Sequence, residues 1–239
     1  MNIALIGYGK MGREIEQIAI RRGHSVVLKV DEHNAKTFTD EELKKASVAI
    51  EFSTPDSVYD NTIRCFSAGV PVVAGTTGWT DKLSRIQEEC IQYGGAFFYA
   101  SNYSIGVNIL FSINRYLARI MDKYPDYEPV LEETHHIYKK DSPSGTAITL
   151  ADQIISELKR KTNWIEGLSN EPGMLQIHSK REGDVPGTHS VKYSSDIDDI
   201  EIIHTAHNRR GFALGAVLAA EWIAGKKGVF GMADLMGDL

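Results

Sequence analysis

The chain has 239 residues, enough for one large domain or two small ones, and its composition of 42% hydrophobic and 24% charged residues is ordinary for a globular protein. Its 26 basic and 32 acidic residues give a formal net charge of −6 without a long basic run, which argues against nucleic acid or an anionic membrane as a partner. The N-terminus opens into an apolar run that lacks a signal-peptide pattern, and no apolar run approaches the roughly 20 residues of a spanning helix, so the sequence predicts a soluble, cytoplasmic protein.

The two cysteines, Cys65 and Cys90, both lie in helical patterns and do not form a CxxC motif. They could pair, but small buried hydrophobic side chains in a reducing compartment are the favoured interpretation.

The first motif is a glycine-rich turn between a strand and a helix. Residues 2–6 form a short apolar run typical of a buried parallel strand, and residues 7–12 then fit the pattern G-x-G-x-x-G. A helical pattern follows, and a second strand over residues 25–30 ends at Asp31, 19 residues after Gly12. Strand, glycines, helix, strand and acid in this order indicate a dinucleotide site, whereas the glycine pattern alone would be weak evidence.

Each part of this motif has a physical role in binding a dinucleotide. Gly7 permits the tight turn, Gly9 lets the backbone approach a pyrophosphate, and Gly12 lets helix and strand pack closely. The N–H groups at the helix start favour the phosphates, and Asp31 is placed to accept a hydrogen bond from the ribose 2′-hydroxyl.

The alternation of strands and helices continues to about residue 104. Strands are predicted at residues 48–52, 70–74 and 96–100, with helices at 56–68 and 81–93. This order predicts a parallel, doubly wound sheet of the Rossmann type, in which ligands lie beyond the carboxyl ends of the strands. The turn Gly75-Thr76-Thr77-Gly78 falls at such an end, which favours contact with a nicotinamide over a plain loop. Because residues 33–46 are short and polar, we expect the sheet to have fewer than six strands.

The second half predicts a different domain, mixed α+β with an open sheet. Amphipathic helices are expected at residues 107–124 and 146–161, and strands at 129–134, 174–180, 188–194 and 201–206. Exposed sheet faces of this kind often support self-association. A small-residue helix at residues 213–224 is expected to return to the first domain. The predicted division is therefore residues 1–104, completed by residues 209–239, as the dinucleotide-binding domain, and residues 105–208 for substrate binding and oligomerisation.

Residues 132–147, E-E-T-H-H-I-Y-K-K-D-S-P-S-G-T-A, crowd titratable groups beside a helix start. Ser144 reads as the N-cap, and Gly145 and Thr146 open a helix whose N–H groups suit a carboxylate or phosphate. Lys139 adds positive charge, and a histidine with an unperturbed pKa of roughly 6.5 can donate a proton near neutrality. The segment is interpreted as a site that binds an anionic substrate and moves a proton. Glu132, Glu133 and Asp141 are interpreted as solvated charges or as charges paired within the protein. Arg181, Arg209 and Arg210 are left open between surface salt bridges and contacts with an anion.

A metal site at the adjacent histidines is not favoured. In an extended run His135 and His136 point to opposite faces, and no further His or Cys falls at a ligand spacing nearby. We therefore expect no metal. Packing or surface positions are kept for His204 and His207, and no role is given to His24, His33, His178 or His189.

The segment Glu133-Thr134-His135-His136-x-x-Lys139-x-Asp141-Ser142-Pro143-Ser144-Gly145-Thr146-Ala147 resembles the signature of the 4-hydroxy-tetrahydrodipicolinate reductases, also called dihydrodipicolinate reductases, of the diaminopimelate route to lysine. The similarity covers nearly the whole chain. Further matching segments follow in the family's order: 7–12, 51–55, 75–78, 100–106, 185–188 and Phe212.

The resemblance implies that NADH or NADPH passes a hydride to a cyclic, dehydrated dicarboxylate substrate, in a homotetramer joined through the second domain. His135 would protonate the reduced ring, and Lys139 would assist as a second donor or a charge on the substrate. A substrate carboxylate would be held by His136 and by the turn Ser144, Gly145 and Thr146. Arg209 and Phe212 match positions near the substrate and nicotinamide less tightly. The residues implied for the cofactor are Gly7, Tyr8, Gly9, Lys10, Met11, Gly12, Asp31, Gly75, Thr76, Thr77, Ala100, Ser101, Asn102 and Tyr103.

The sequence departs from the family pattern at Thr134 and Ser142, where alanine is usual, and in the short segment 33–46. Asp31 favours NADH because a carboxylate repels a 2′-phosphate, although Lys10 could offset this effect, so use of both cofactors stays open. Two alternatives also remain. One is a nucleotide-binding sensor whose His-Lys segment serves a protein partner, and the other is a different reductase of the same architecture.

Overall fold

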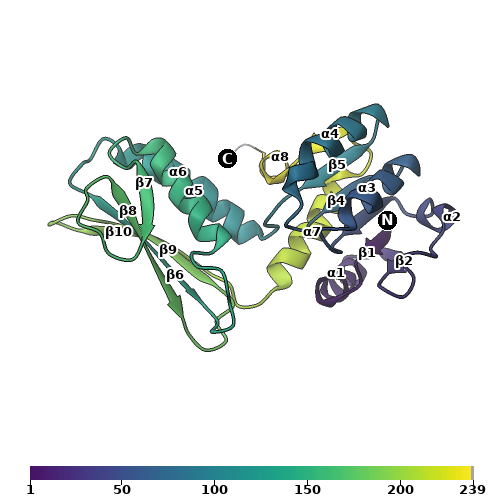
Figure 1. The fold of residues 1–239 in the computed structure, drawn as a ribbon, viewed down its shortest axis with the longest axis horizontal. Helices are drawn as coiled ribbons and strands as arrows, with labels where there is room; N and C mark the ends of the chain where they lie inside the picture. The colour runs from purple at the N-terminus through teal and green to yellow at the C-terminus, as the bar shows by residue number, and fades with distance from the viewer. Residues whose placement is uncertain (238–239) are drawn as a thin grey trace. The chain divides into compact units, whose positions relative to one another are not determined.

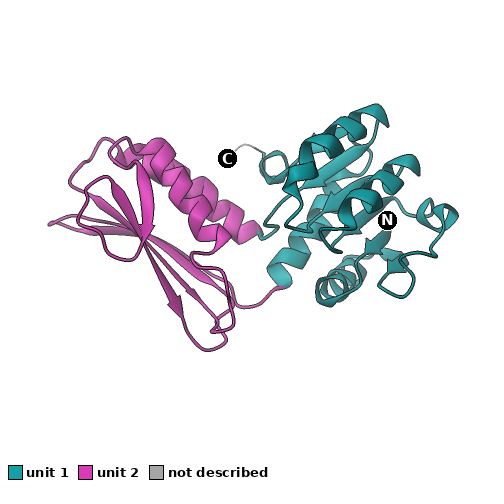
Figure 2. Cartoon of the chain, viewed as in Figure 1, with its two compact units in different colours: residues 1–104, 210–239 teal, residues 105–209 magenta. Residues whose placement is uncertain are grey.

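The computed structural model describes residues 1–237, and Figure 2 shows the chain divided into two compact units. Residues 105–209 form unit 2, and the rest of the described chain forms unit 1. Each unit buries a hydrophobic cluster of its own, so each can be described by itself.

Unit 1 is a Rossmann-type unit built on a parallel six-stranded sheet in the order β11-β5-β4-β3-β1-β2 (Figure 1). The strands are short apolar runs, which suits strands covered on both faces. They are β1 (Asn2–Ile6), β2 (Ser25–Val30), β3 (Val48–Glu51), β4 (Val72–Ala74), β5 (Ala96–Tyr99) and β11 (Gly228–Phe230). The helices are α1 (Lys10–Arg21), α2 (Asp40–Leu43), α3 (Val58–Ser67), the 3₁₀ turn η1 (Thr80–Lys82), α4 (Leu83–Gln92), α7 (Arg210–Ile223) and α8 (Met232–Met236).

Helices cover both faces of this sheet, as the alternating pattern predicted. Helices α3 and α4 pack over one face, where Cys65, Phe66 and Ile86 join the buried cluster, while α1 and α7 pack against each other. Both cysteines are free and buried. The Rossmann class expected from the sequence is confirmed.

The expected sheet size was wrong. Residues 33–46 contain only the short helix α2, so no strand forms there, as their polarity indicated. A sixth strand comes instead from the far C-terminus, where β11 pairs with β5. This three-residue strand is too short to show a hydrophobic periodicity, and its partner β5 lies more than a hundred residues away in sequence.

Unit 2 is a mixed five-stranded sheet in the order β10-β9-β6-β8-β7. Strand β6 (Glu128–His135) lies at the centre, antiparallel to β9 (Thr188–Ser194) and parallel to β8 (Met174–Arg181). The edges are β10 (Asp199–Thr205) and β7 (Asn163–Glu166), of which β7 was not predicted. The class, a second unit with an open mixed sheet, is confirmed.

Helices α5 (Ile105–Met121) and α6 (Gly145–Glu157) cover one face of this sheet (Figure 1). Alternate residues of β6 face them: Pro129, Leu131, Glu133 and His135 are buried, and the residues between are not. The other face carries exposed Ile165 and Ile203, 37% and 59% exposed. Among the described residues, the structure has no helix of the length and hydrophobicity needed to cross a bilayer.

Candidate active site

A cavity of about 620 Å³ lies in unit 1 at the carboxyl ends of β1, β2 and β3. This is where a doubly wound sheet binds its ligand. Four of the residues expected to bind cofactor line it: Gly7, Tyr8, Gly9 and Asp31. Several other lining residues were not predicted to bind the cofactor: Arg13, Glu32, His33, Phe52, Ser53, Thr54, Ser57 and Asn61.

The first two glycines of the turn act differently. Gly7 has φ +98, and a Cβ placed on it would lie 2.1 Å from the carbonyl oxygen of Phe52. Gly9 has φ −86 and caps α1, and a Cβ placed there would meet no atom within 4 Å. Gly7 is therefore required by the fold, whereas Gly9 leaves open space beside the helix start, as a pyrophosphate would need.

Replacing Gly9 with alanine should separate these two effects. We expect the free energy of unfolding to change by about 1 kcal/mol or less, because the backbone angle is negative and the space is open. We expect the dissociation constant for NADH to rise about tenfold or more, since the added methyl group occupies the space of the pyrophosphate. Fluorescence titration of NADH and urea unfolding would measure both, and unchanged NADH affinity would contradict the assignment.

Asp31 directly follows β2 and is half-buried, with one carboxylate oxygen accepting from the N–H of His33 at 2.9 Å. Lys10, the residue that could offset the charge of Asp31, is exposed and does not line the cavity. Arg13 lines it instead. Lys29 pairs with Glu16 at 2.5 Å, so its charge is already neutralised.

A buried carboxylate, Glu51, fixes two of the turns at this edge of the sheet. It is fully buried at the end of β3 and accepts hydrogen bonds from Ser53 and Asn61, and from Thr76 at 2.7 Å. Burial raises the pKa of Glu51, and these donors oppose that shift. The turns after β3 and β4 are thereby tied to each other.

The remaining residues expected at the cofactor lie outside the residues that line this cavity: Lys10, Met11, Gly12, Gly75, Thr76, Thr77, Ala100, Ser101, Asn102 and Tyr103. Thr76 is buried against Glu51, and Tyr103 is buried with its hydroxyl donating to the carbonyl of Ala74 at 2.8 Å. Those two side chains are used inside unit 1, so a cofactor contact there would have to come from the backbone.

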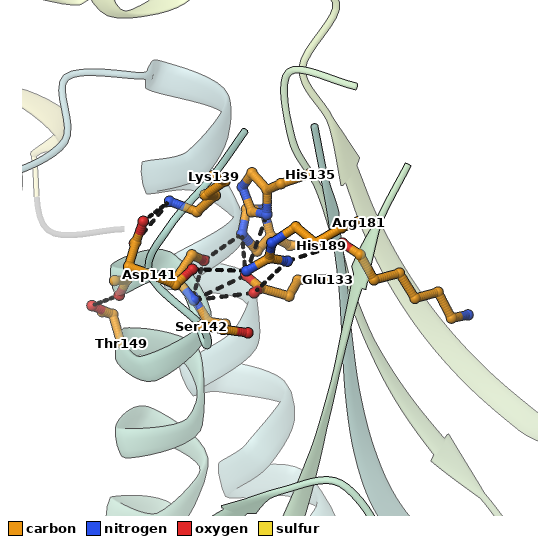
Figure 3. Close-up of polar contacts among 12 residues, drawn as sticks. Glu133, His135, Lys139, Asp141, Ser142, Thr149, Arg181 and His189 are labelled. Atoms are coloured by element: carbon orange, nitrogen blue, oxygen red, sulfur yellow. Dashed lines mark hydrogen bonds and ion pairs between the residues drawn. The ribbon is translucent and has the colours of Figure 1, made fainter. Parts of the chain in front are cut away.

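The proton-handling segment lies in unit 2, at the end of β6 and in the loop to α6. The register of the sheet places Glu133 opposite His189 of β9, and His135 opposite Arg181 of β8. The Glu133 carboxylate lies 3.5 Å from His135 Nδ1, 3.6 Å from His189 Nε2 and 3.5 Å from Arg181 Nη1 (Figure 3). Glu133, His135 and His189 are buried.

The start of α6 joins this cluster. Ser144 caps the helix as the sequence indicated: its hydroxyl accepts from the N–H of Ala147 at 3.2 Å. The same hydroxyl lies 3.1 Å from His189 Nε2, and the Ser144 N–H donates to both oxygens of Glu133. That N–H is therefore already used. Gly145 and Thr146 are the first two residues of the helix.

The cations at the rim are held by neighbouring oxygens. Lys139 Nζ lies 2.8 Å from both oxygens of Asp141, and Arg181 donates to the carbonyls of Asp141 and Lys180 (Figure 3). Asp141 thus pairs internally, as was proposed for it. Lys139 would have to leave this exposed carboxylate to reach a substrate.

The pKa of His135 is shifted from the ordinary value of a histidine. Burial lowers its pKa to about 4; Glu133 opposes this shift, while His189, Lys139 and Arg181 reinforce it. Burial raises the pKa of Glu133, but its contacts with His189, Ser144 and His135 together outweigh burial and lower this pKa to about 2. These shifts favour a neutral His135 beside an ionised Glu133 near neutral pH, with the pKa of His135 below the unperturbed value of roughly 6.5. The role of His135 as the proton donor stays a prediction.

His189 is a third possible metal ligand, which the sequence spacing did not indicate. His189 comes from another strand, and one ligand atom from each of Glu133, His135 and His189 lies within 4.8 Å of the others. Both oxygens of Glu133 already accept from Ser144, and Arg181 adds a fixed positive charge, neither of which suits a cation site. The expectation that no metal takes part stays a prediction.

Comparison with known proteins gives a consistent result along the whole chain. The family model described as "Dihydrodipicolinate reductase, N-terminus" matches residues 1–103, and "Dihydrodipicolinate reductase, C-terminus" matches residues 106–236. A relative named 4-hydroxy-tetrahydrodipicolinate reductase from Christiangramia forsetii is 48% identical, and the alignment covers 100% of this chain and 99% of the relative. One with the same name from Methanosarcina barkeri is 38% identical, with 98% of this chain and 89% of that relative covered.

A solved structure shares the fold. The dipicolinate-bound dihydrodipicolinate reductase from Paenisporosarcina sp. TG-14 superposes with a TM-score of 0.76 at 24% identity, covering 98% of both chains. At that identity the likeness supports the architecture of the chain.

Proposed function

The chain belongs to the dihydrodipicolinate reductase family, and on that premise we propose how its two sites divide the reaction. The enzyme is a 4-hydroxy-tetrahydrodipicolinate reductase, an NAD(P)H-dependent oxidoreductase of lysine biosynthesis by the diaminopimelate route. Unit 1 holds the cofactor, and unit 2 holds the substrate and supplies the proton. The observation that carries this division is the placement of His135, buried at the end of β6 beside the N-terminus of α6.

The cavity of unit 1 is the proposed site of the cofactor. Its phosphates would lie at the open space beside Gly9 and the N–H groups at the start of α1, and its ribose beside Asp31. When bound, the reduced nicotinamide supplies a hydride, which is two electrons. His135 supplies the balancing proton to the ring, so that one double bond of the substrate is reduced.

The substrate is a cyclic dicarboxylate, which matches the charges of unit 2. Gly145 and Thr146, at the start of α6, and His136 would hold one carboxylate. Lys139 would give up Asp141 and place its charge on the substrate. His135 is then the group that moves a proton, and the neighbouring charges set when it is protonated.

NADH is the proposed preferred cofactor. Asp31 and Glu32 both line the ribose end of the cavity, where carboxylates repel a 2′-phosphate. Arg13 is the basic residue there, while Lys29 is neutralised by Glu16. The ratio of kcat/KM for NADH and NADPH tests this preference, and a higher value for NADPH would overturn it.

We also propose a cytoplasmic homotetramer. The open face of the unit 2 sheet carries Ile165 and Ile203, and large apolar side chains on an exposed sheet are commonly covered by another subunit. Light scattering after size exclusion measures the assembly, and a monomer would overturn this proposal.

The reductase activity itself is tested with purified enzyme, NADH or NADPH, and the condensation product of pyruvate and aspartate semialdehyde. We expect the cofactor to be oxidised only when this substrate is present. Absence of oxidation with either cofactor would exclude the proposed function.

The low pKa of His135 makes a separate prediction. Because the free enzyme holds this imidazole neutral, a bound dianion should raise its pKa and draw in about one proton. Calorimetric titration with dipicolinate, at one neutral pH in buffers of different ionisation enthalpy, measures that uptake. The variant His135→Gln should take up almost none, and equal uptake by the two proteins would assign the proton to another group.

A further inference from the structure

Glu133 is a buried carboxylate of unit 2 that the proposed reaction leaves unused. The residue is 1% exposed, and it lies on the covered face of β6, between Leu131 and His135. A carboxylate in such a place needs several partners, because an unpaired buried charge is costly. Its partners include the proposed proton donor and the start of the proposed carboxylate-binding helix, beside His189 and Arg181.

The contact with His135 selects one form of the imidazole. Nδ1 is buried, lies 3.5 Å from Glu133 Oε2 at an ion-pair distance, and makes no hydrogen bond among the described residues. An ionised carboxylate only accepts, so the proton of the neutral ring belongs on Nδ1. Nε2 lies on the side of Gly187, where a Cβ would approach it to 3.0 Å, so the glycine leaves room at that nitrogen.

The other contact fixes the carboxylate itself. The N–H of Ser144 donates to Oε1 at 3.1 Å and to Oε2 at 3.2 Å. Ser144 is the N-cap of α6, and its hydroxyl reaches His189 Nε2 at 3.1 Å. The carboxylate of Glu133 therefore connects the donor histidine to the end of the helix where a substrate carboxylate would bind.

We propose that Glu133 is a positioning residue that holds His135 in the Nδ1–H form and fixes it relative to the N-terminus of α6. In this form Nε2 is the nitrogen that gains the proton and gives it to the substrate, while Glu133 keeps its charge and transfers no proton. The same logic applies to other histidine acids oriented by a carboxylate, where the wrong tautomer costs most of the rate. This inference rests on the proposed function, which makes His135 the proton donor.

Kinetics of Glu133→Gln test the catalytic consequence. The glutamine oxygen can still accept from Ser144, but its NH₂ group then faces Nδ1 and favours the opposite tautomer. We expect kcat to fall about 100-fold with KM for NADH unchanged, because the cofactor cavity lies in unit 1. Glu133→Asp keeps a carboxylate and should recover part of the loss. The matched control is Glu132→Gln, whose exposed carboxylate pairs with Lys180 and should be replaced without loss.

Nuclear magnetic resonance tests the geometry without using activity. Nitrogen-15 shifts of the imidazole, assigned with His135→Gln, should show the Nδ1–H tautomer in the unliganded wild-type protein and the Nε2–H tautomer in Glu133→Gln. A wild-type His135 in the Nε2–H form would overturn the proposal, and this measurement requires no variant of Glu133 to fold. A folded Glu133→Gln enzyme with the kcat of Glu132→Gln would overturn it as well.

Failure of the proposed function would look different. If the wild-type enzyme did not oxidise NADH or NADPH with the substrate, the reductase assignment would fail whatever the tautomer. An Nδ1–H ring that changes its tautomer in Glu133→Gln would still show that the carboxylate controls His135.

Discussion

Replacement of His135 with glutamine is expected to lower kcat by about 100-fold or more while KM for NADH stays within about twofold of the wild-type value. Glutamine keeps much of the size and polarity of the imidazole but cannot give up a proton at neutral pH. The cofactor cavity is lined by residues 6–61 of unit 1, whereas His135 belongs to unit 2, so the loss should be confined to turnover.

His178→Gln is the matched control for this experiment. His178 lies on β8 of the same sheet, between Ile177, which is buried, and Ser179, which is half-buried. Its partner on β6 is the half-exposed Glu132 on the open face. Its replacement should leave kcat unchanged. Parallel losses of turnover and of cofactor affinity in His135→Gln would contradict the role of His135 as proton donor.

Replacement of Gly7 with alanine is expected to lower the free energy of unfolding by about 2–5 kcal/mol. Two costs add. The residue has φ +98, and its Cβ would lie 2.1 Å from the carbonyl oxygen of Phe52, which is backbone and cannot rotate away. The first turn would shift relative to β3, and NADH binding should weaken with it.

Gly23→Ala separates the two costs. Gly23 also has a positive φ, +82, but a Cβ there would meet nothing within 4 Å. It should therefore cost only the backbone strain, about 1–2 kcal/mol. Urea unfolding of both variants gives the comparison, and equal losses would show that the contact with Phe52 is relieved cheaply.

The fold class could be predicted because its signals are local. The strands of unit 1 are short apolar runs separated by glycine-rich turns, and α6 begins at a serine that caps it. Strand β11 was not predicted, because it has only three residues and its place at the edge of the sheet depends on pairing with β5. The contribution of a distant segment to a sheet is a property of packing, which a local pattern does not contain.

The candidate site was predictable as a segment but not as a network. His135, Lys139 and Ser144 lie within ten residues of one another, so their crowding is visible in the sequence. His189 is brought to them by the pairing of β6 with β9, which sequence spacing does not reveal.

A signal for Glu133 was present in the sequence. Along β6 it alternates with Leu131 and His135, which places the three side chains on one face. A carboxylate that shares a face with a buried leucine needs hydrogen-bond donors within the protein. This pattern therefore favours internal pairing of Glu133 over its exposure to solvent. His189 alternates with the buried Val191 and Tyr193 of β9 in the same way.

The central claim is that the enzyme passes a hydride from bound reduced nicotinamide to a cyclic dicarboxylate while His135 adds the proton. It is tested most directly by turnover with NADH carrying deuterium at the transferring position, followed by mass spectrometry of the product. The account predicts product that contains one deuterium, formed at a rate that falls about 100-fold in His135→Gln. Product without deuterium, or equal rates from the wild-type and His135→Gln enzymes, would contradict it.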